Sequence, residues 1–326
     1  MLKKRKLGAQ GLEVSELGLG CLGMSASYGS PDDAESIRTI HRAIELGVTF
    51  FDTAESYGPY VNEELLGRAI AGKRDGLVLA TKFGWDIRDG RITGTDSRPA
   101  HIRQVAEACL QRLGTDRIDL FYQHRIDPHI PVEEVAQAVG ELVKAGKVRF
   151  FGVSEAGVEN IRRAHRVHPV TALQSEYSLW ERNLENEILP VLRELGIGLV
   201  PFAPLGRGFL TGVVKRAEEY PPTDWRHDDP RFMGENYDAN VRAAEAVRAV
   251  AARRQATPAQ VCLAWLLRKG NDIVPIPGTK RREFLEENVA AASIVLSAEE
   301  IRELEGAMAH VAGPRYIPER MKYVDR

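Results

Sequence analysis

The chain has 326 residues, of which 44% are hydrophobic and 28% are charged, and its 44 basic and 46 acidic side chains leave a formal net charge of −2. This composition is typical of a globular protein with a large core, and the near-neutral charge gives no global reason to expect nucleic acid or an anionic membrane as a partner. No apolar run reaches the roughly 18 to 20 residues of a membrane span, and none of signal-peptide length follows the basic N-terminus, so the sequence predicts a cytoplasmic protein.

The three cysteines, Cys21, Cys109 and Cys262, are far apart and lack the spacing of a metal site or a disulfide framework. We expect Cys109 and Cys262, on predicted helices, to be buried apolar residues. Cys21 lies in a glycine-rich loop and could line a site. The sequence therefore predicts no metal centre.

In chain order, a short ribbon at about residues 5–14 precedes apolar, strand-like runs that alternate with amphipathic helical stretches. The predicted strands cover residues 17–19, 49–51, 77–81, 118–122, 148–153, 172–174, 198–202 and 272–275. The predicted helices have polar or proline starts and several have glycine ends; they cover about 32–46, 132–145, 186–195 and 258–269. The last of these is expected to have Thr257 as its N-cap and Pro258 at its first position. A capping box at 297–300 begins one more helix after the last strand.

Regular alternation of strand and helix implies a parallel sheet with right-handed crossovers, and eight repeats favour a closed (β/α)8 TIM barrel over an open sheet. The predicted fold class is therefore α/β, with residues 1–326 in one domain, an N-terminal β-ribbon and an extra C-terminal helix. The longest irregular stretch, about 206–236, is interpreted as a loop over the barrel mouth. The tail at about 313–326 is a second candidate wall of that mouth.

Four polar residues lie at or near the ends of predicted strands: Asp52, Tyr57, Lys82 and His124. Because the carboxyl ends of the strands converge in a parallel barrel, these side chains are expected to share one pocket. A phenol, an ammonium, a carboxylate and an imidazole together indicate proton transfer to or from a carbonyl oxygen.

Ordered motifs run through nearly the whole chain. They are residues 51–58 (FDTAESYG), 63–67 (EELLG), 81–82 (TK), 119–124 (DLFYQH), 152–154 (GVS), 174–177 (QSEY), 201–206 (PFAPLG) and 275–280 (PIPGTK). In these motifs the sequence resembles the aldo-keto reductase superfamily. The Ser154–Glu155 pair and the PGTK run at 277–280 are similar to its microbial and plant branch.

The resemblance implies reduction of an aldehyde or ketone to an alcohol by hydride from NADPH, with Tyr57 as the general acid. A phenol has a pKa of about 10, and a cation about 4 Å away could favour its ionisation by up to roughly 4 kcal/mol. Lys82 is expected to supply that cation, Asp52 to hold Lys82, and His124 to orient the substrate oxygen.

The resemblance also implies an extended dinucleotide across the mouth, since no GxGxxG follows a predicted strand. Ser154 and Gln174 match residues that hold the nicotinamide carboxamide, and Glu155 stands where many relatives have Asn. Phe202 is preferred over Tyr177 as the residue that stacks on the nicotinamide. Residues expected at the pyrophosphate are Ala203, Leu205, Arg207 and Gly208.

After the last strand, Gly278, Thr279, Lys280, Arg281 and Arg282 place three cations at a helix start, where anions are favoured. A 2′-phosphate would explain this cluster, so NADPH/NADP+ is expected over NADH. A solvated basic turn is the alternative. Glu287 and Asn288 match residues on the adenine side.

The expected partner is a small aldehyde or ketone, with Met24, Tyr28, Trp85 and Trp225 as candidate substrate contacts. Two other functions are alternatives to reduction. Some members of the superfamily work as nicotinamide-binding regulatory or sensor subunits with little turnover. A barrel metallohydrolase is disfavoured because no His-x-His pair ends the first strand.

Overall fold

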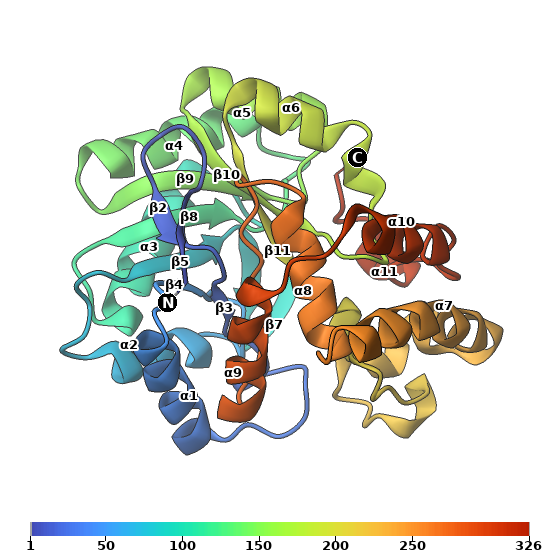
Figure 1. Ribbon diagram of the computed structural model, residues 1–326. Helices are drawn as coiled ribbons and strands as arrows, with labels where there is room; N and C mark the ends of the chain where they lie inside the picture. Colours follow the sequence, from blue (N-terminus) through green and yellow to red (C-terminus); the bar gives the residue numbers. More distant parts are fainter. Residues whose placement is uncertain (1, 326) are drawn as a thin grey trace.

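The computed structural model describes residues 2–325. Its centre is a parallel sheet of seven strands in the order β11-β10-β9-β8-β5-β4-β3 (Figure 1). The strands are β3 (Leu19–Gly20), β4 (Phe50–Asp52), β5 (Val78–Phe83), β8 (Ile118–Gln123), β9 (Val148–Ser154), β10 (Val170–Glu176) and β11 (Gly198–Phe202). Each lies within two residues of a strand that the sequence predicts.

The segment 273–278 fills the eighth position and closes the barrel. It forms parallel bridges between Leu199 and Ile273 on one side and between Gly20 and Gly278 on the other. Pro275 lies within it and has no N–H to donate, so the segment pairs through separate bridges instead of a continuous ladder. The predicted (β/α)8 barrel is confirmed, with an eighth strand of irregular geometry.

Helices surround the sheet (Figure 1). They are α1 (Asp33–Glu45), α2 (Val61–Ile70), α3 (Pro99–Leu113), α4 (Val132–Lys144), α5 (Val158–Val167), α6 (Ile188–Leu195), α7 (Gly234–Arg253), α8 (Pro258–Arg268), α9 (Arg282–Ala290), α10 (Ala298–Ala307) and α11 (Pro318–Met321). The predicted caps are present: the side chains of Asp32, Thr257 and Ser297 accept backbone N–H groups of α1, α8 and α10. Local side-chain chemistry therefore sets these helix starts.

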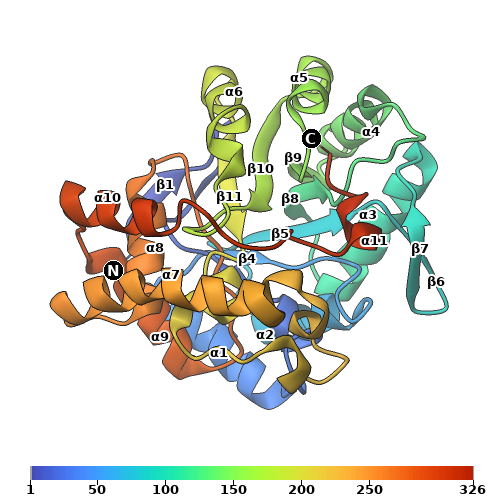
Figure 2. The same cartoon turned by 90° about the vertical axis from the view of Figure 1, so that its right-hand side faces the viewer.

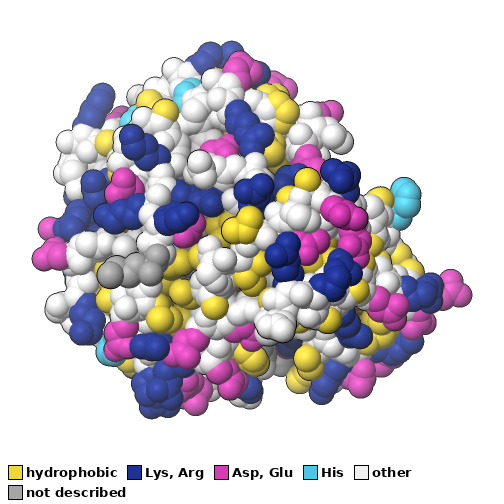
Figure 3. All heavy atoms as spheres, viewed as in Figure 1, with side chains coloured by type: hydrophobic (Ala, Val, Ile, Leu, Met, Phe, Trp, Pro, Cys, Tyr) yellow, Lys and Arg dark blue, Asp and Glu magenta, His cyan; other side chains and the backbone are white. Residues whose placement is uncertain are grey.

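The predicted N-terminal ribbon is the antiparallel hairpin of β1 (Lys4–Lys6) and β2 (Glu13–Ser15). Its Leu7, Leu12 and Val14 are buried with Phe50 and Val200 in the core inside the barrel. Figure 3 shows the face of the molecule on which this hairpin lies, where Lys and Arg side chains gather. Several of these charges are compensated, as in the ion pair of Arg193 with Asp272.

Two features differ from the expectation. A second hairpin, β6 (Trp85–Arg88) with β7 (Arg91–Thr95), follows β5. The long mouth loop contains four 3-10 turns (Gly206–Thr211, Ala217–Glu219, Trp225–Asp228 and Pro230–Phe232) before α7 starts at Gly234. The C-terminal tail crosses the molecule from α10 to α11 (Figure 2).

Gly152 in β9 provides a test of the packing inside the barrel. A Cβ at this position would lie 2.4 Å from Cδ1 of the buried Tyr122 ring. We expect Gly152→Ala to lower the free energy of unfolding by about 1–3 kcal/mol in urea denaturation, because the core must shift to accept the methyl group.

Gly306 in α10 is the matched control, since a Cβ there meets no atom within 4 Å. Gly306→Ala should raise the free energy of unfolding by roughly 0.5–1 kcal/mol. Equal effects of the two substitutions would contradict the close packing of β9 against Tyr122.

Candidate active site

The four polar residues at the strand ends lie together at the carboxyl end of the barrel. Asp52 ends β4, Lys82 lies near the end of β5, and His124 directly follows β8. These three strands are neighbours in the sheet, so their ends converge. Tyr57 lies in the turn between β4 and α2 and reaches the same point.

The Lys82 ammonium is the centre of this group. It is fully buried, and its Nζ donates to Asp52 Oδ1 at 2.5 Å, to the Thr53 carbonyl at 2.7 Å and to Tyr57 Oη at 3.0 Å. Burial by itself lowers the pKa of Lys82, but Asp52 and Tyr57 outweigh this effect and the pKa rises. Lys82 is therefore charged at neutral pH and has all three N–H groups bonded.

The Tyr57 phenol experiences two opposing effects. Burial raises its pKa, while the charge and hydrogen bond of Lys82 lower it. Burial is the larger effect, so the net shift is upward. Tyr57 is accordingly protonated at neutral pH, the state that a proton donor requires.

His124 is buried beside this group, with its ring 5.9 Å from the Tyr57 ring in an edge-on arrangement. Burial and the charges of Lys82 and Arg125 lower the pKa of His124 well below 6.5. The imidazole is therefore neutral at pH 7. Ser56 Oγ lies 3.4 Å from Nδ1, so Nε2 is the nitrogen left to face a ligand.

The residues expected at a nicotinamide lie on the next strands of the barrel. Ser154 ends β9, and its Oγ accepts a hydrogen bond of 3.2 Å from Arg125. Gln174 on β10 donates through Nε2 to Asp52 Oδ2 at 2.7 Å. Gln174 is thus joined to the ion pair of Lys82 and Asp52.

The carboxylate of Glu155 is bonded to other groups of the protein. Its Oε1 accepts from Ser175 Oγ and from the Glu176 N–H, both at 2.8 Å, and its other oxygen pairs with Arg315 of the tail. The backbone of Glu155 has a φ of +54°, a region that side chains rarely adopt. These contacts hold the strained residue in place.

Phe202 and Tyr177 occupy different environments. Tyr177 is fully buried, packs against Trp265 at 5.4 Å and donates its hydroxyl to Glu185. Phe202 ends β11 and is half-buried. Only Phe202 of the two has a face available at the mouth.

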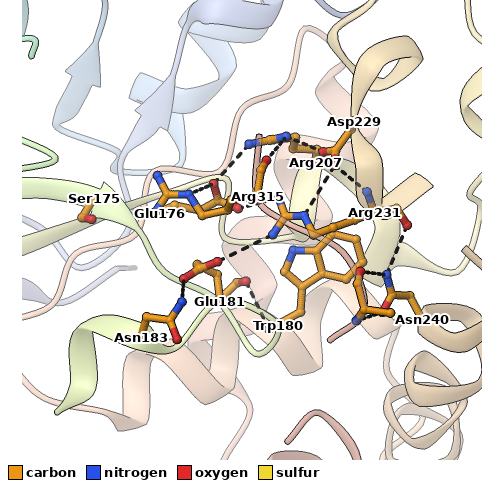
Figure 4. A network of polar contacts seen from close by, with 12 residues as sticks. Ser175, Glu176, Trp180, Glu181, Asn183, Arg207, Asp229, Arg231, Asn240 and Arg315 are labelled. Carbon is orange, nitrogen blue, oxygen red and sulfur yellow. Dashed lines mark hydrogen bonds and ion pairs between the residues drawn. The ribbon is translucent and has the colours of Figure 1, made fainter. Parts of the chain in front are cut away.

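Three buried arginines form an ionic cluster around Glu176 (Figure 4). Arg207 and Arg231 donate to the two carboxylate oxygens of Glu176 at 3.1 and 2.9 Å, and Arg315 Nε lies 3.2 Å away. Burial alone would raise the pKa of Glu176, but the three guanidinium groups lower it to about 2. Arg207 also pairs with Asp229. The guanidinium of Arg207 is thus already satisfied by carboxylates.

The backbone after β11 bends sharply. Ala203, Gly206, Arg207 and Gly208 all have positive φ, of 46°, 57°, 57° and 90°. Three of them, 206–208, are consecutive, so the chain turns tightly here, and the N–H of Gly206 is bonded to the Ala203 carbonyl at 2.9 Å. The N–H of Gly208 is bonded to the Leu205 carbonyl at 3.1 Å.

The predicted cationic group lies at the start of α9, with Gly278 and Thr279 just before it. Lys280 donates to the carbonyls of Tyr28 and Ser30 at 2.9 and 2.6 Å, and Arg282 pairs with Glu35 at 3.0 Å. Arg281 is exposed and stacks on Phe284 at 5.6 Å. Of the adenine-side candidates, Glu287 accepts from Thr257 and Asn288 is buried.

The candidate substrate contacts are dispersed. Trp85 is the nearest to the chemistry, with its ring 5.6 Å from His124 and 5.0 Å from Tyr323 of the tail. Met24 is fully buried in a core cluster with Cys21. Tyr28 and Trp225 belong to two loops that meet, where the Trp225 N–H bonds to the Ser27 carbonyl at 3.1 Å.

Sequence reasoning missed four residues near the mouth: Arg125, Arg226, Arg315 and Tyr323. Arg226 lies between the rings of Tyr28 and Tyr220, at 5.3 and 4.1 Å. Arg125 could have been found, because it directly follows His124 at a strand end. Arg315 and Tyr323 had no local sequence signal. Only their position in the tail, which was expected to line the mouth, pointed to them.

The cysteine predictions agree with the structure, since Cys109 and Cys262 are buried on helices α3 and α8. Cys21 is buried as well. Within residues 2–325, no cluster of His, Cys, Asp and Glu side chains has the makings of a metal site. Over the same residues no helix has the length and apolarity needed to span a membrane.

Comparisons with known proteins identify relatives over almost the full chain. The model of the Aldo/keto reductase family matches residues 16–309. A soybean (Glycine max) protein named "Probable aldo-keto reductase 1" is 45% identical over 317 residues, which cover 95% of this chain and 91% of that protein.

Two solved structures are similar to this chain over almost its full length. The glycerol dehydrogenase AKR11B4 from Gluconobacter oxydans has a TM-score of 0.86 at 29% identity, over 97% of this chain and 98% of its own. The thermostable aldo-keto reductase Tm1743, in complex with the inhibitor epalrestat, has a TM-score of 0.76 at 30% identity. The match covers 94% of this chain and 100% of that chain. The chain belongs to the aldo-keto reductase family of oxidoreductases, which act on small carbonyl compounds with nicotinamide cofactors.

Proposed function

We propose that this protein reduces aldehydes or ketones to alcohols with NADPH, and that Tyr57 is the proton donor. One observation carries the proposal: the buried Lys82 ammonium binds both the Asp52 carboxylate and the Tyr57 phenol oxygen. A lysine that only needed a structural partner would be satisfied by Asp52. Its bond to a partly exposed phenol instead prepares that phenol to carry negative charge.

The residues around this group fit a dinucleotide. Ser154, Gln174 and Phe202 lie at or near the ends of three successive strands, where a nicotinamide could reach the Tyr57 phenol. The bent backbone around 203–208 suits a pyrophosphate, and the basic start of α9 suits a further phosphate. When bound, such a cofactor supplies the hydride that side chains cannot.

In the proposed reaction the substrate oxygen accepts hydrogen bonds from Tyr57 Oη and from the Nε2–H of neutral His124. On reduction of the carbonyl carbon, Tyr57 Oη would give its proton to the substrate oxygen and become a phenolate. Lys82 stabilises this phenolate across a 3.0 Å hydrogen bond, and Asp52 keeps Lys82 fixed at that distance. Trp85 and Tyr323 enclose the reacting carbonyl with apolar surface.

Tyr57→Phe tests the assignment of the acid. The variant should lose about 10²- to 10⁴-fold in kcat for 4-nitrobenzaldehyde, because it cannot transfer a proton, while it still binds NADPH. The kcat comes from NADPH consumption, and the affinity comes from a fluorescence titration. A Tyr57→Phe enzyme with near wild-type kcat would exclude Tyr57 as the acid.

Replacing Lys280, Arg281 and Arg282 together by Ala tests the choice of cofactor. The dissociation constant for NADPH should rise about 10- to 100-fold, since charge-assisted bonds to the 2′-phosphate are lost. NADH is the matched control because it lacks only that phosphate. Equal losses for both nucleotides would reject a 2′-phosphate site at α9.

The protonation of His124 gives a pH test. Its folded pKa lies well below the ordinary 6.5, so the folded state resists protonation while the unfolded chain accepts a proton near pH 6.5. The stability contributed by neutral His124 is complete above pH 6.5 and declines as the pH falls toward its folded pKa.

By NMR, the Cε1–H signal of His124, identified by its absence in His124→Asn, should stay constant between pH 7.5 and 6. A midpoint near pH 6.5 would mean that the folded imidazole titrates normally, contrary to the geometry described above.

A further inference from the structure

Arg125 places a positive charge at the reacting end of the pocket. It directly follows His124, and its Nη1 donates to the His124 carbonyl at 2.9 Å and to Ser154 Oγ at 3.2 Å. It is half-buried, and its charge contributes to the lowered pKa of both His124 and Glu155. Arg125 therefore lies between the proposed substrate-orienting imidazole and the proposed nicotinamide site.

Carboxylates do not compensate this charge directly. Three other arginines at the mouth have acidic partners: Arg207, Arg231 and Arg315 share Glu176, Asp229 and Glu155 (Figure 4). Glu155 is close enough for the charge of Arg125 to lower its pKa, but both of its carboxylate oxygens are bonded to other groups. Among residues 2–325, Arg125 forms no ion pair.

Partial desolvation of a guanidinium is costly, and no carboxylate offsets this cost at Arg125. Arg125 has five N–H donors, and the two hydrogen bonds described here both use Nη1. The planar fork that remains matches a carboxylate or a phosphate group. Both the missing partner and the available donors therefore indicate an anionic group on a bound ligand.

The position of Arg125 favours the substrate as the source of this group. The substrate carbonyl is proposed to lie between Tyr57 and His124, and Arg125 is the next residue along the chain. The pyrophosphate of the cofactor is proposed to lie at 203–208, and the 2′-phosphate at α9. The aromatic rings of Trp85 and Tyr323 would contact the apolar body of the same substrate.

We propose that Arg125 determines substrate specificity by binding a carboxylate or phosphate attached to the aldehyde or ketone. The preferred substrates are then anionic carbonyl compounds, such as oxo acids or phosphorylated aldehydes. This inference rests on the proposed reductase function and adds the chemical class of its substrate.

The test compares 4-carboxybenzaldehyde with methyl 4-formylbenzoate, two aldehydes of similar shape that differ in charge. The wild-type protein should prefer the acid in kcat/KM. Arg125→Met should lower the ratio of kcat/KM for acid over ester by about 10- to 100-fold, the range expected for one charge-assisted bond. A titration with NADPH, followed by fluorescence, reports separately on cofactor binding.

Arg91→Met is the matched control, because Arg91 is an exposed arginine of β7 in the hairpin that begins at Trp85. It should leave the acid-to-ester ratio unchanged. If Arg125→Met also leaves this ratio unchanged, or changes only the NADPH affinity, Arg125 does not bind the substrate anion. If the wild-type protein reduces neither aldehyde, the reductase function itself fails.

Carboxylate and phosphate substrates are separated by a second pair of compounds. The pair is D-glyceraldehyde 3-phosphate and unphosphorylated D-glyceraldehyde. If phosphate is the group bound, Arg125→Met should lower the ratio of kcat/KM for the phosphorylated over the unphosphorylated compound. Dependence with the carboxylate pair alone would assign an oxo acid. No dependence on Arg125 with either pair overturns the proposal.

Discussion

The contact between Lys82 and Asp52 is the interaction on which the site depends. An ammonium with no exposed surface carries a desolvation penalty of several kcal/mol, which only a well-placed carboxylate and further hydrogen-bond acceptors can offset. Asp52 Oδ1, the Thr53 carbonyl and Tyr57 Oη meet this requirement. Because these groups come from the ends of β4 and β5 and the turn after β4, the register of the barrel fixes the position of Tyr57, the proposed acid.

A second buried ionic group, around Glu176, has a different task. It joins β10 to two long segments that have little regular structure, the mouth loop through Arg207 and Arg231 and the tail through Arg315. Asp325 extends this attachment, since its carboxylate accepts from the Gly157 N–H and from Asn160 at the start of α5. The tail is thereby held against the mouth, and Tyr323 is held against Trp85. Loop and tail are thus tied to the strand ends by specific contacts.

Much of this architecture was predictable, for identifiable reasons. The strands were found because buried parallel strands are continuous apolar runs, and helix starts such as Thr257 and Ser297 were found because capping is local. Asp52, Lys82 and His124 were expected together because each lies at a strand end. The hairpin of β6 and β7 was missed although its signal is local: Trp85 and Ile87 alternate with polar residues, and the turn is Asp89–Gly90, both with positive φ. The ionic cluster was also out of reach: the pairing of Arg315 with Glu155 joins residues 160 positions apart and depends on tertiary packing. Arg207 was expected at a phosphate, whereas the structure pairs it with Glu176 and Asp229.

The most direct test of the account is the fate of the hydride. The protein would be incubated with 4-nitrobenzaldehyde and NADPH deuterated at C4 of the nicotinamide, separately on each face, and the alcohol analysed by mass spectrometry. The account predicts that one of the two labelled cofactors delivers a single deuterium to the carbinol carbon and the other delivers none. Product without deuterium from either cofactor, or no product beside tight NADPH binding, would contradict carbonyl reduction at the site of Asp52, Tyr57, Lys82 and His124.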